Sequence, residues 1–293
     1  MSKPPDLPDM ELDLITGLLA DHNDDPRFNH AGVHDIHRDI RTVLDDYPHA
    51  VSIGEIWVFD NAEFAKYLRP DELHMGFNFR LVRAPFDAAA VHDAITNAVA
   101  AAALAGASPT WTLSNHDVVR EVTRYGGGAS CSTTQGLARA RAMAMVMLAP
   151  PGAVFVYNGE ELGLPNVDLP DAVLPDPVWE RSGRTERGRD GCRVPMPWEG
   201  SSPPFGFSTN PRTWLPIPAD WSTLTVERQL ADRGSTLNFF RELITLRHST
   251  FRFDSNDVEW VRLDQHVLAF RSGGVLCVLN LDPWTDPGEV WGV

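Results

Sequence analysis

The stretch Thr112-Leu-Ser-Asn-His-Asp-Val-Val-Arg120 is the main indicator of the fold of this chain. It follows Ser108-Pro-Thr-Trp111, so a short apolar and β-branched run ends abruptly in the polar side chains of Asn115, His116 and Asp117. This pattern is typical of a buried strand that feeds a loop. A turn or a helix cap is the alternative interpretation, because asparagine and aspartate are common at both.

A second predicted strand ends in the same way. Ala50-Val-Ser-Ile-Gly-Glu-Ile-Trp57 is largely apolar and terminates near the carboxylate of Glu55. Residues 73–82 and 151–158 are predicted to be two further strands. Helices are predicted around these strands at residues 32–47, 61–68, 87–105, 133–148 and 235–249.

Hydrophobic periodicity assigns an apolar face to the first and last of these helices. Residues 32–47 place Val33, Ile36, Ile40, Val43 and Leu44 at helical spacing, which predicts an amphipathic helix. In residues 235–249 the pattern predicts a helix whose inward side carries Leu237, Phe240, Ile244 and Leu246. Residues 1–31 are predicted to form a long loop around a brief helical turn at residues 12–19.

The order of these elements indicates an α/β fold. Residues 50–249 alternate strand and helix four times, which predicts half of an eightfold (β/α)8 barrel. Residues 162–234 form a long loop whose many aromatic residues favour order. Three short strands, at residues 258–263, 267–271 and 275–281, then indicate antiparallel β structure. We therefore divide the chain into a partial barrel, residues 1–249, and a small β domain, residues 250–293.

Composition limits the classes of function. With 40 acidic and 25 basic residues the formal net charge is −15, which argues against nucleic acid or an anionic membrane as a partner. No signal-peptide pattern and no stretch long enough to span a bilayer is recognised, so a cytoplasmic protein is expected. Cys131, Cys192 and Cys277 are widely spaced, which predicts neither disulfides nor a zinc site. No cofactor or metal is predicted.

The polar strand ends have the chemistry needed to cleave a glycosidic bond. Such cleavage requires a carboxylic acid that protonates the departing oxygen and a carboxylate that stabilises positive charge on the sugar ring. Glu55 and Asp117 are the right residue types for these two tasks. His116 and Asn115 could hydrogen-bond sugar hydroxyls. Packed or surface roles are the alternative for each of these side chains.

Four motifs resemble those of the α-amylase family of glycoside hydrolases. They are Gly54-Glu-Ile-Trp57, Leu113-Ser-Asn-His-Asp-Val-Val-Arg120, Tyr157-Asn-Gly-Glu-Glu-Leu-Gly-Leu-Pro165 and Arg189-Asp-Gly-Cys-Arg-Val-Pro-Met-Pro-Trp198. Their order is most similar to the α-glucosidase and oligo-1,6-glucosidase branch. The resemblance implies a TIM barrel of which this chain holds strands five to eight. It also implies a retaining hydrolase of α-glucosidic bonds in short gluco-oligosaccharides, acting in carbohydrate metabolism.

The resemblance also assigns residue roles. Glu55 is implied to be the general acid and base, and Asp117 to bind the glucose hydroxyls and stabilise the transition state with help from His116. Arg193 is implied to approach the aglycone side, with an ordinary ion pair as the alternative. Glu160 and Glu161 are interpreted as structural.

One element of the family pattern does not occur in these residues. The nucleophilic aspartate of the family lies in a Gly-Phe-Arg-x-Asp segment, and the 293 residues contain no such segment. We therefore expect a truncated chain that is inactive alone. The alternatives are a remnant with weak sugar binding at most, one half of a split enzyme completed by a separate chain, and, among enzymes, a glucosyl isomerase of the trehalose synthase or isomaltulose synthase type.

Overall fold

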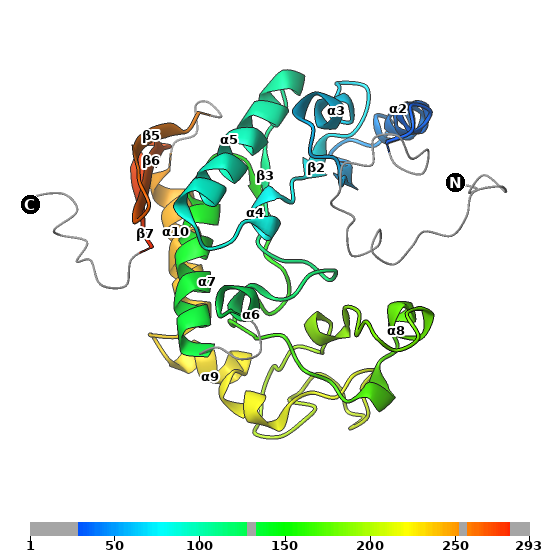
Figure 1. Cartoon of the computed structure of the whole chain (residues 1–293), viewed down its shortest axis with the longest axis vertical. Helices are drawn as coiled ribbons and strands as arrows, with labels where there is room; N and C mark the ends of the chain where they lie inside the picture. Colours follow the sequence, from blue (N-terminus) through cyan, green and yellow to red (C-terminus); the bar gives the residue numbers. More distant parts are fainter. Residues whose placement is uncertain (1–28, 128–132, 252–256, 282–293) are drawn as a thin grey trace, which may run out of the picture.

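The computed structural model describes residues 29–127, 133–251 and 257–281, so the turn predicted at residues 12–19 and Cys131 lie outside the described residues. Four short strands run through the middle of the molecule (Figure 1). They are β1 (Ile53–Glu55), β2 (Met75–Phe77), β3 (Thr110–Trp111) and β4 (Ala153–Val154). β1 pairs with β2 and β3 pairs with β4, both in parallel, as the α/β pattern predicts.

Thr110 joins the two strand pairs. Its hydroxyl donates to the carbonyl oxygen of Gly76 at 2.6 Å and accepts from the N–H of Asn78 at 3.0 Å. Both contacts are buried, so the side chain pairs with backbone groups of β2 and of Asn78, the residue that follows β2. The four strands therefore lie in the order β1, β2, β3, β4, with their carboxyl ends at one edge.

All four strands are shorter than the sequence predicts. Residues 73–82 were expected to be one strand, but only Met75–Phe77 pairs, and Arg80–Arg83 forms the short helix α4. Residues 155–158 leave β4 for a turn that continues to residue 163. Apolar residues beyond a strand end are buried by packing rather than by pairing, and periodicity alone does not separate the two.

Helices cover the strands and form the main core with them. The longer ones are α2 (Val33–Leu44), α5 (Ala88–Ala105), α7 (Thr133–Leu148) and α10 (Thr236–Thr250), and the shorter ones are α3 (Asn61–Lys66) and α6 (Glu121–Tyr125). The main core joins residues of α5 and α7 to Trp111 and Leu113, which are 1% and 0% exposed. The predicted helices are thus confirmed, and this core fixes the start of the loop that follows β3.

Helix α5 corrects one expectation. By length and composition alone it could cross a membrane, which differs from the expectation that no stretch is long enough to span a bilayer. Val91, Ile95, Ala98 and Ala101 are nevertheless buried within the protein. A core helix of a water-soluble fold passes the same length and composition test, and the burial of these residues is what such a helix requires.

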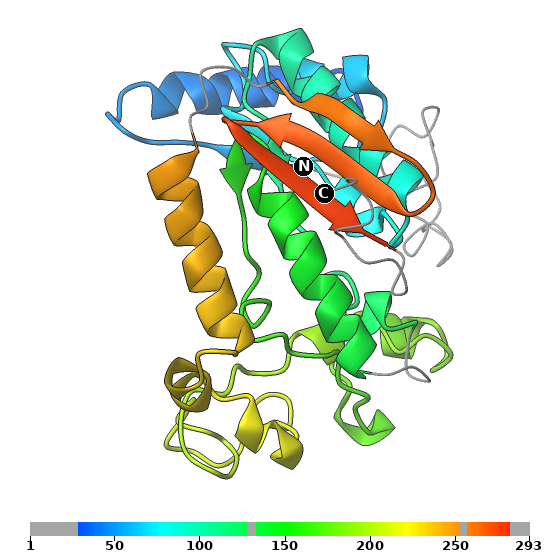
Figure 2. The ribbon, with the colours of Figure 1, turned by 90° about the vertical axis from the view of Figure 1, so that its left-hand side faces the viewer.

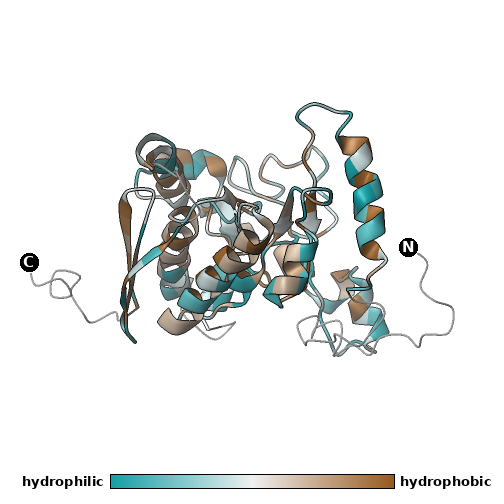
Figure 3. Cartoon of the chain, turned by 90° about the horizontal axis from the view of Figure 1, so that it is seen from above, coloured by the Kyte–Doolittle hydropathy of each residue, from teal (hydrophilic) through white to brown (hydrophobic). Residues whose placement is uncertain are grey.

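Helix α2 presents its apolar side to solvent. Ile36, Ile40 and Val43 are 43%, 45% and 59% exposed, and His34 is the only residue of the helix that is buried. Polar contacts attach the helix instead, because the His34 ring lies 2.7 Å from the Glu72 carboxylate. Figure 3 shows α2 at the edge of the molecule. The amphipathic helix is confirmed, but its apolar face packs against a buried cluster, the one that contains Phe64, only through Val33 among the described residues.

Helix α10 is also turned differently from the prediction. Phe240 is buried and Leu237 is half-buried as expected, but Ile244 and Leu246 are 38% and 44% exposed. Leu243 and Arg247 lie on the inner side instead, and Arg247 donates to backbone carbonyls near the start of β4. A short apolar repeat leaves the rotation of a helix uncertain by about one position.

The long loop is ordered around a core of its own. Leu162, Leu164, Phe205, Leu215 and Trp221 are among its buried residues. The short helices of the loop are η1 (Asp171–Val173), α8 (Pro177–Arg181), η2 (Asp190–Cys192), η3 (Ala219–Thr223) and α9 (Val226–Ala231). They form the lower part of the molecule in Figure 1. The loop is thereby rigid enough to position side chains beside the strand ends.

The C-terminal strands form an antiparallel sheet, as predicted. β5 (Glu259–Leu263), β6 (Val267–Ser272) and β7 (Val275–Asn280) pair in the order β5-β6-β7. Figure 2 shows this sheet lying across the helices that flank the strands. Leu268, Phe270 and Leu279 are buried in the main core, so the sheet closes one side of it.

Candidate active site

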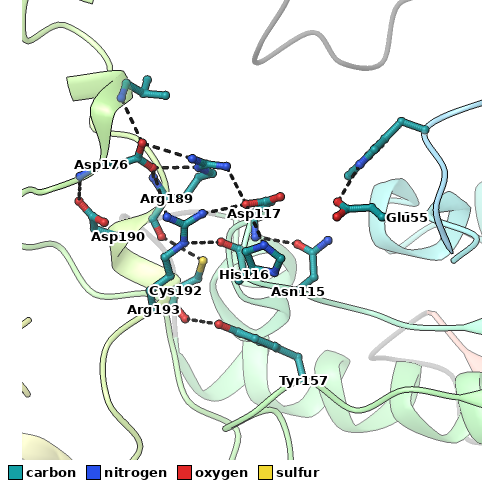
Figure 4. Close-up of polar contacts among 12 residues, drawn as sticks. Glu55, Asn115, His116, Asp117, Tyr157, Asp176, Arg189, Asp190, Cys192 and Arg193 are labelled. Atoms are coloured by element: carbon teal, nitrogen blue, oxygen red, sulfur yellow. Dashed lines mark hydrogen bonds and ion pairs between the residues drawn. The ribbon is translucent and has the colours of Figure 1, made fainter. Parts of the chain in front are cut away.

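The predicted site residues lie at the edge where the parallel strands end. Glu55 is the last residue of β1, and Asn115, His116 and Asp117 occupy the loop after β3. In Figure 4 the carboxyl groups of Glu55 and Asp117 extend toward the same open space. The alternation of strands and helices therefore brings together two carboxyls that are far apart in the sequence.

Aromatic side chains hold Glu55 in position. The indole N–H of Trp57 donates to Oε1 of Glu55 at 3.0 Å, and the Trp57 ring stacks on Phe79 with ring centroids 4.1 Å apart. Phe77 continues this aromatic surface toward Phe155, at a centroid distance of 4.6 Å. Glu55 itself is exposed, so its second oxygen can meet a ligand from solvent.

A local hydrogen bond shapes the loop that carries Asp117. The N–H of Asp117 donates to Oδ1 of Asn115 at 2.8 Å, which is an Asx-type turn. The His116 ring is 58% exposed, and its Nε2 lies 3.6 Å from Oδ1 of Asp117. Asn115 therefore uses its side-chain oxygen for the turn, and its amide nitrogen and the His116 ring are the groups that a ligand could reach.

Two arginines from the long loop bind Asp117. Nη1 of Arg189 and Nη2 of Arg193 each lie 2.8 Å from Oδ1 of Asp117, and Nε of Arg193 donates to the carbonyl oxygen of His116 at 2.7 Å. Every hydrogen bond that the Asp117 carboxylate accepts from the described residues goes to Oδ1. Oδ2 is thus left for a ligand, and the two guanidinium groups hold the carboxylate in one orientation.

Sequence reasoning found Arg193 but missed Arg189. The structure places Arg193 against the Asp117 loop rather than out in the open space, so the ion pair that was its alternative interpretation does form. Arg189 lies four residues earlier within a motif that was recognised, yet nothing local marks it as a partner of Asp117. The available signal was that the recognised motif contains two arginines, Arg189 and Arg193, four residues apart.

Asp176 binds Arg189 and holds it in position. Its side chain is fully buried, and Oδ2 accepts from both Nε and the backbone N–H of Arg189 at 2.9 Å. Burial acts to raise the pKa of Asp176, but the hydrogen bonds from Arg189 and from the Val178 N–H outweigh burial and lower it to about 2. Asp176 therefore remains ionised and orients the arginine that binds Asp117.

Replacing Asp176 by asparagine is expected to destabilise the protein by on the order of 1–2 kcal/mol at neutral pH, allowing for solvent screening. A lowered pKa in the folded state contributes stability above the ordinary aspartate pKa, and that contribution is lost as pH falls through about 2. The difference between wild type and Asp176→Asn in urea unfolding should therefore shrink as the pH is lowered. A difference that stays constant with pH would contradict this account.

Metal binding has no obvious location here. Among residues 29–127, 133–251 and 257–281, no group of three or more histidine, cysteine, aspartate or glutamate side chains is placed to hold an ion. Burial raises the pKa of the Cys192 thiol to about 11, so this cysteine near the site is a protonated side chain at neutral pH.

A comparison with protein families finds one match. The family described as "Alpha amylase, catalytic domain" matches residues 1–254. A protein named probable alpha-glucosidase from Rhizobium meliloti (strain 1021) is 33% identical over 255 residues, which are 82% of this chain and 44% of that protein. An oligo-1,6-glucosidase from Heyndrickxia coagulans is 28% identical over 285 residues, 85% of this chain and 49% of that protein. The chain spans about half the length of these curated relatives.

Solved structures resemble the fold. The α-glucosyl transfer enzyme XgtA has a TM-score of 0.74 at 33% identity, covering 86% of this chain and 46% of its own. The trehalulose synthase MutB from Pseudomonas mesoacidophila MX-45 has a TM-score of 0.73 at 24% identity, covering 86% of this chain and 50% of its own. At that identity the second likeness concerns the fold alone.

Proposed function

Because the chain belongs to the α-amylase catalytic-domain family, we propose that it carries half of the active site of an α-glucosidase-type retaining glycoside hydrolase acting on short α-linked gluco-oligosaccharides. The observation that carries the proposal is the pair Glu55 and Asp117, which reach the same open space from the ends of the parallel strands β1 and β3. The family membership agrees with the motif resemblance found in the sequence. Names of the relatives, an alpha-glucosidase and an oligo-1,6-glucosidase, support this substrate class.

Glu55 acts as the general acid and then as the general base. Its exposed carboxyl can protonate the glycosidic oxygen as the bond breaks, and later it can take a proton from the attacking water. The hydrogen bond from Trp57 holds one oxygen, so the other faces the substrate.

Asp117 binds the glucose unit. Its Oδ2 accepts from sugar hydroxyls while Arg189 and Arg193 hold Oδ1, and the negative charge stabilises the oxocarbenium-like transition state. The His116 ring and the amide nitrogen of Asn115 add hydrogen bonds to hydroxyls. Arg193 binds the loop that carries Asp117, and it influences the aglycone side by positioning that loop.

The four strands β1 to β4 serve as strands five to eight of the barrel, within a domain of residues 1–249 that precedes the β domain of residues 250–293. A segment outside these residues supplies the first four strands and the attacking aspartate. Two features support this proposal: the second edge of β1 pairs with none of the described strands, and Ile36, Ile40 and Val43 of the apolar stripe of α2 are exposed. The segment can belong to the same polypeptide or to a separate chain in the cytoplasm.

A complementation assay tests the proposal. The 293-residue polypeptide alone should release no glucose from maltose, isomaltose or p-nitrophenyl α-glucoside, because it contains no Gly-Phe-Arg-x-Asp segment. Adding a polypeptide with the first four strands of a family barrel should produce activity, and adding one in which the attacking aspartate is alanine should not. Glucose release by the 293 residues alone would overturn the account of the nucleophile.

Glucosyl transfer is the second candidate, favoured by the 33% identity to an α-glucosyl transfer enzyme. Hydrolysis and transfer share the same acid and nucleophile and differ in what attacks the intermediate. In the complemented enzyme, chromatography of products formed with an added alcohol acceptor distinguishes them. Glucosides of the acceptor indicate transfer, free glucose indicates hydrolysis, and an isomer of the starting disaccharide indicates the isomerase alternative.

A further inference from the structure

A buried arginine joins the three segments that form the candidate site. Arg120, which ends the loop bearing Asp117, is 0% exposed. Its Nη1 donates to the carbonyl oxygen of Asn158 at 2.8 Å, and its Nη2 donates to the carbonyl oxygen of Cys192 at 2.9 Å. Asn158 lies in the turn after β4, and Cys192 is the last residue of η2. The guanidinium group therefore connects the loop after β3 to the end of β4 and to the long loop.

The carbonyl oxygen of Cys192 has a second donor. The Tyr157 hydroxyl donates to it at 3.1 Å (Figure 4), and the Arg120 guanidinium carbon lies 5.0 Å from the centre of the Tyr157 ring. Burial raises the pKa of Tyr157, so its hydroxyl keeps its proton and remains a donor at neutral pH. Two side chains that follow β3 and β4 therefore hold the same carbonyl oxygen of η2.

The contacts of Arg120 explain why a charged side chain is buried here. Both hydrogen bonds that its guanidinium donates within the described residues go to neutral carbonyl groups, and its Nε has no partner among those residues. Burying a charge is costly, and an apolar side chain of similar volume would avoid that cost. A guanidinium group is however a planar fork, which can donate to carbonyl oxygens of two separate segments at once. The geometry therefore indicates that Arg120 sets the relative position of these segments.

The segment that Arg120 holds also carries the two arginines that bind Asp117. Arg189 directly precedes η2, and Arg193 directly follows it. Nη1 of Arg189 and Nη2 of Arg193 each lie 2.8 Å from Oδ1 of Asp117, and Nε of Arg193 donates to the carbonyl oxygen of His116 at 2.7 Å. A shift or rotation of η2 would therefore move both guanidinium groups relative to the Asp117 carboxylate.

We propose that Arg120, assisted by Tyr157, is a positioning residue that fixes η2 against the loop bearing Asp117. In this position Arg189 and Arg193 hold Oδ1 of Asp117, and Oδ2 stays open to a ligand. Because Arg120 is fully buried, it acts through these two arginines and not on a ligand. This role depends only on the geometry of the chain, and its kinetic consequence alone rests on the proposed function.

Nuclear magnetic resonance of the arginine Nε–H groups in the 293-residue chain tests this role. The Nε–H of Arg193 bridges η2 and the Asp117 loop, whereas the Nε–H of Arg189 donates to Asp176 within the long loop. Arg120→Met fills the space without a donor, so the Arg193 signal should shift and its hydrogen exchange should become about tenfold faster. The Arg189 signal should stay, because its partner belongs to the same loop. A general loss of structure would instead affect both signals.

Three further variants identify the cause of the change. Arg120→Lys keeps the charge without the planar fork, so its exchange rate should lie between those of wild type and Arg120→Met. Tyr157→Phe removes one donor to Cys192 and keeps the ring, so it should change the Arg193 signal in the same direction, and it decides the test if Arg120→Met does not fold. Arg247→Met is the matched control, because Arg247 also donates to backbone carbonyls but does so before β4, at the opposite ends of the strands. It should leave both signals unchanged.

The complemented enzyme provides the kinetic test. Arg120→Met should lower kcat/KM for p-nitrophenyl α-glucoside by on the order of 100-fold, because a small displacement of a binding group has an effect of that size. An Arg193 signal that is unchanged in both Arg120→Met and Tyr157→Phe, or an Arg189 signal that is lost together with it, would overturn the proposal. If the wild-type complemented enzyme were inactive, the proposed function would fail, while the arginine signals would still decide the role of Arg120.

Discussion

Replacing Glu55 by glutamine is expected to lower the turnover of maltose by the complemented enzyme roughly 100- to 10,000-fold. Glutamine keeps the shape of the side chain and can still contact Trp57, but it cannot deliver a proton to the departing oxygen. The loss should be smaller for bond cleavage in p-nitrophenyl α-glucoside, because nitrophenolate leaves without protonation. Steady-state kinetics with the two substrates measure the difference.

The comparison of leaving groups separates a chemical role from a structural one. A variant that merely disturbs the strand end would lower both rates by a similar factor. Glu242→Gln makes the same chemical change at an exposed position of α10 and should leave both rates at the wild-type level. Unchanged maltose turnover in Glu55→Gln would remove Glu55 from the mechanism.

Replacing Trp111 by alanine is expected to cost about 3–5 kcal/mol of folding free energy, the largest effect on stability that we predict. The Trp111 side chain is 1% exposed in the main core, and its indole N–H donates to the carbonyl oxygen of Pro151 at 2.6 Å. Alanine would leave a cavity and an unpaired carbonyl at the junction of β3 and β4. Urea unfolding followed by circular dichroism measures the loss.

Two further substitutions define the source of that loss. Trp111→Phe keeps most of the packing and removes the hydrogen bond, so it should cost about 1–3 kcal/mol. Trp198→Ala removes an indole that is 46% exposed and should cost much less than Trp111→Ala. Equal losses at Trp111 and Trp198 would mean that the β3–β4 junction is not the centre of the core.

The candidate catalytic residues could be predicted because their signal is local. Glu55, Asn115, His116 and Asp117 each follow an apolar run, and such a pattern indicates a strand end whatever the rest of the chain does. The three C-terminal strands could be placed for the same reason, since turn residues separate them. Boundaries were less certain, and residues 80–83 form a helix where a strand was expected.

The orientation of helices could not be predicted as well. Ile36 and Ile40 of α2 and Ile244 of α10 were assigned to apolar faces, and all three are exposed. An apolar stripe indicates that one side of a helix is suited to burial, but that side is buried only if another element packs against it. In α2 the buried side is instead the one that His34 turns toward Glu72.

The sequence by itself determined the residue types at the strand ends, the alternation of strands and helices, and the family to which these patterns belong. Only the tertiary structure decided that Arg189 and Arg193, 72 and 76 positions from Asp117, bind one oxygen of its carboxylate. It also decided that the side chains of Glu121 and Glu160, 1% and 2% exposed, are buried. The physical reason is that strand and helix patterns arise from neighbours in sequence, whereas the partner of a charge depends on the path of the whole chain.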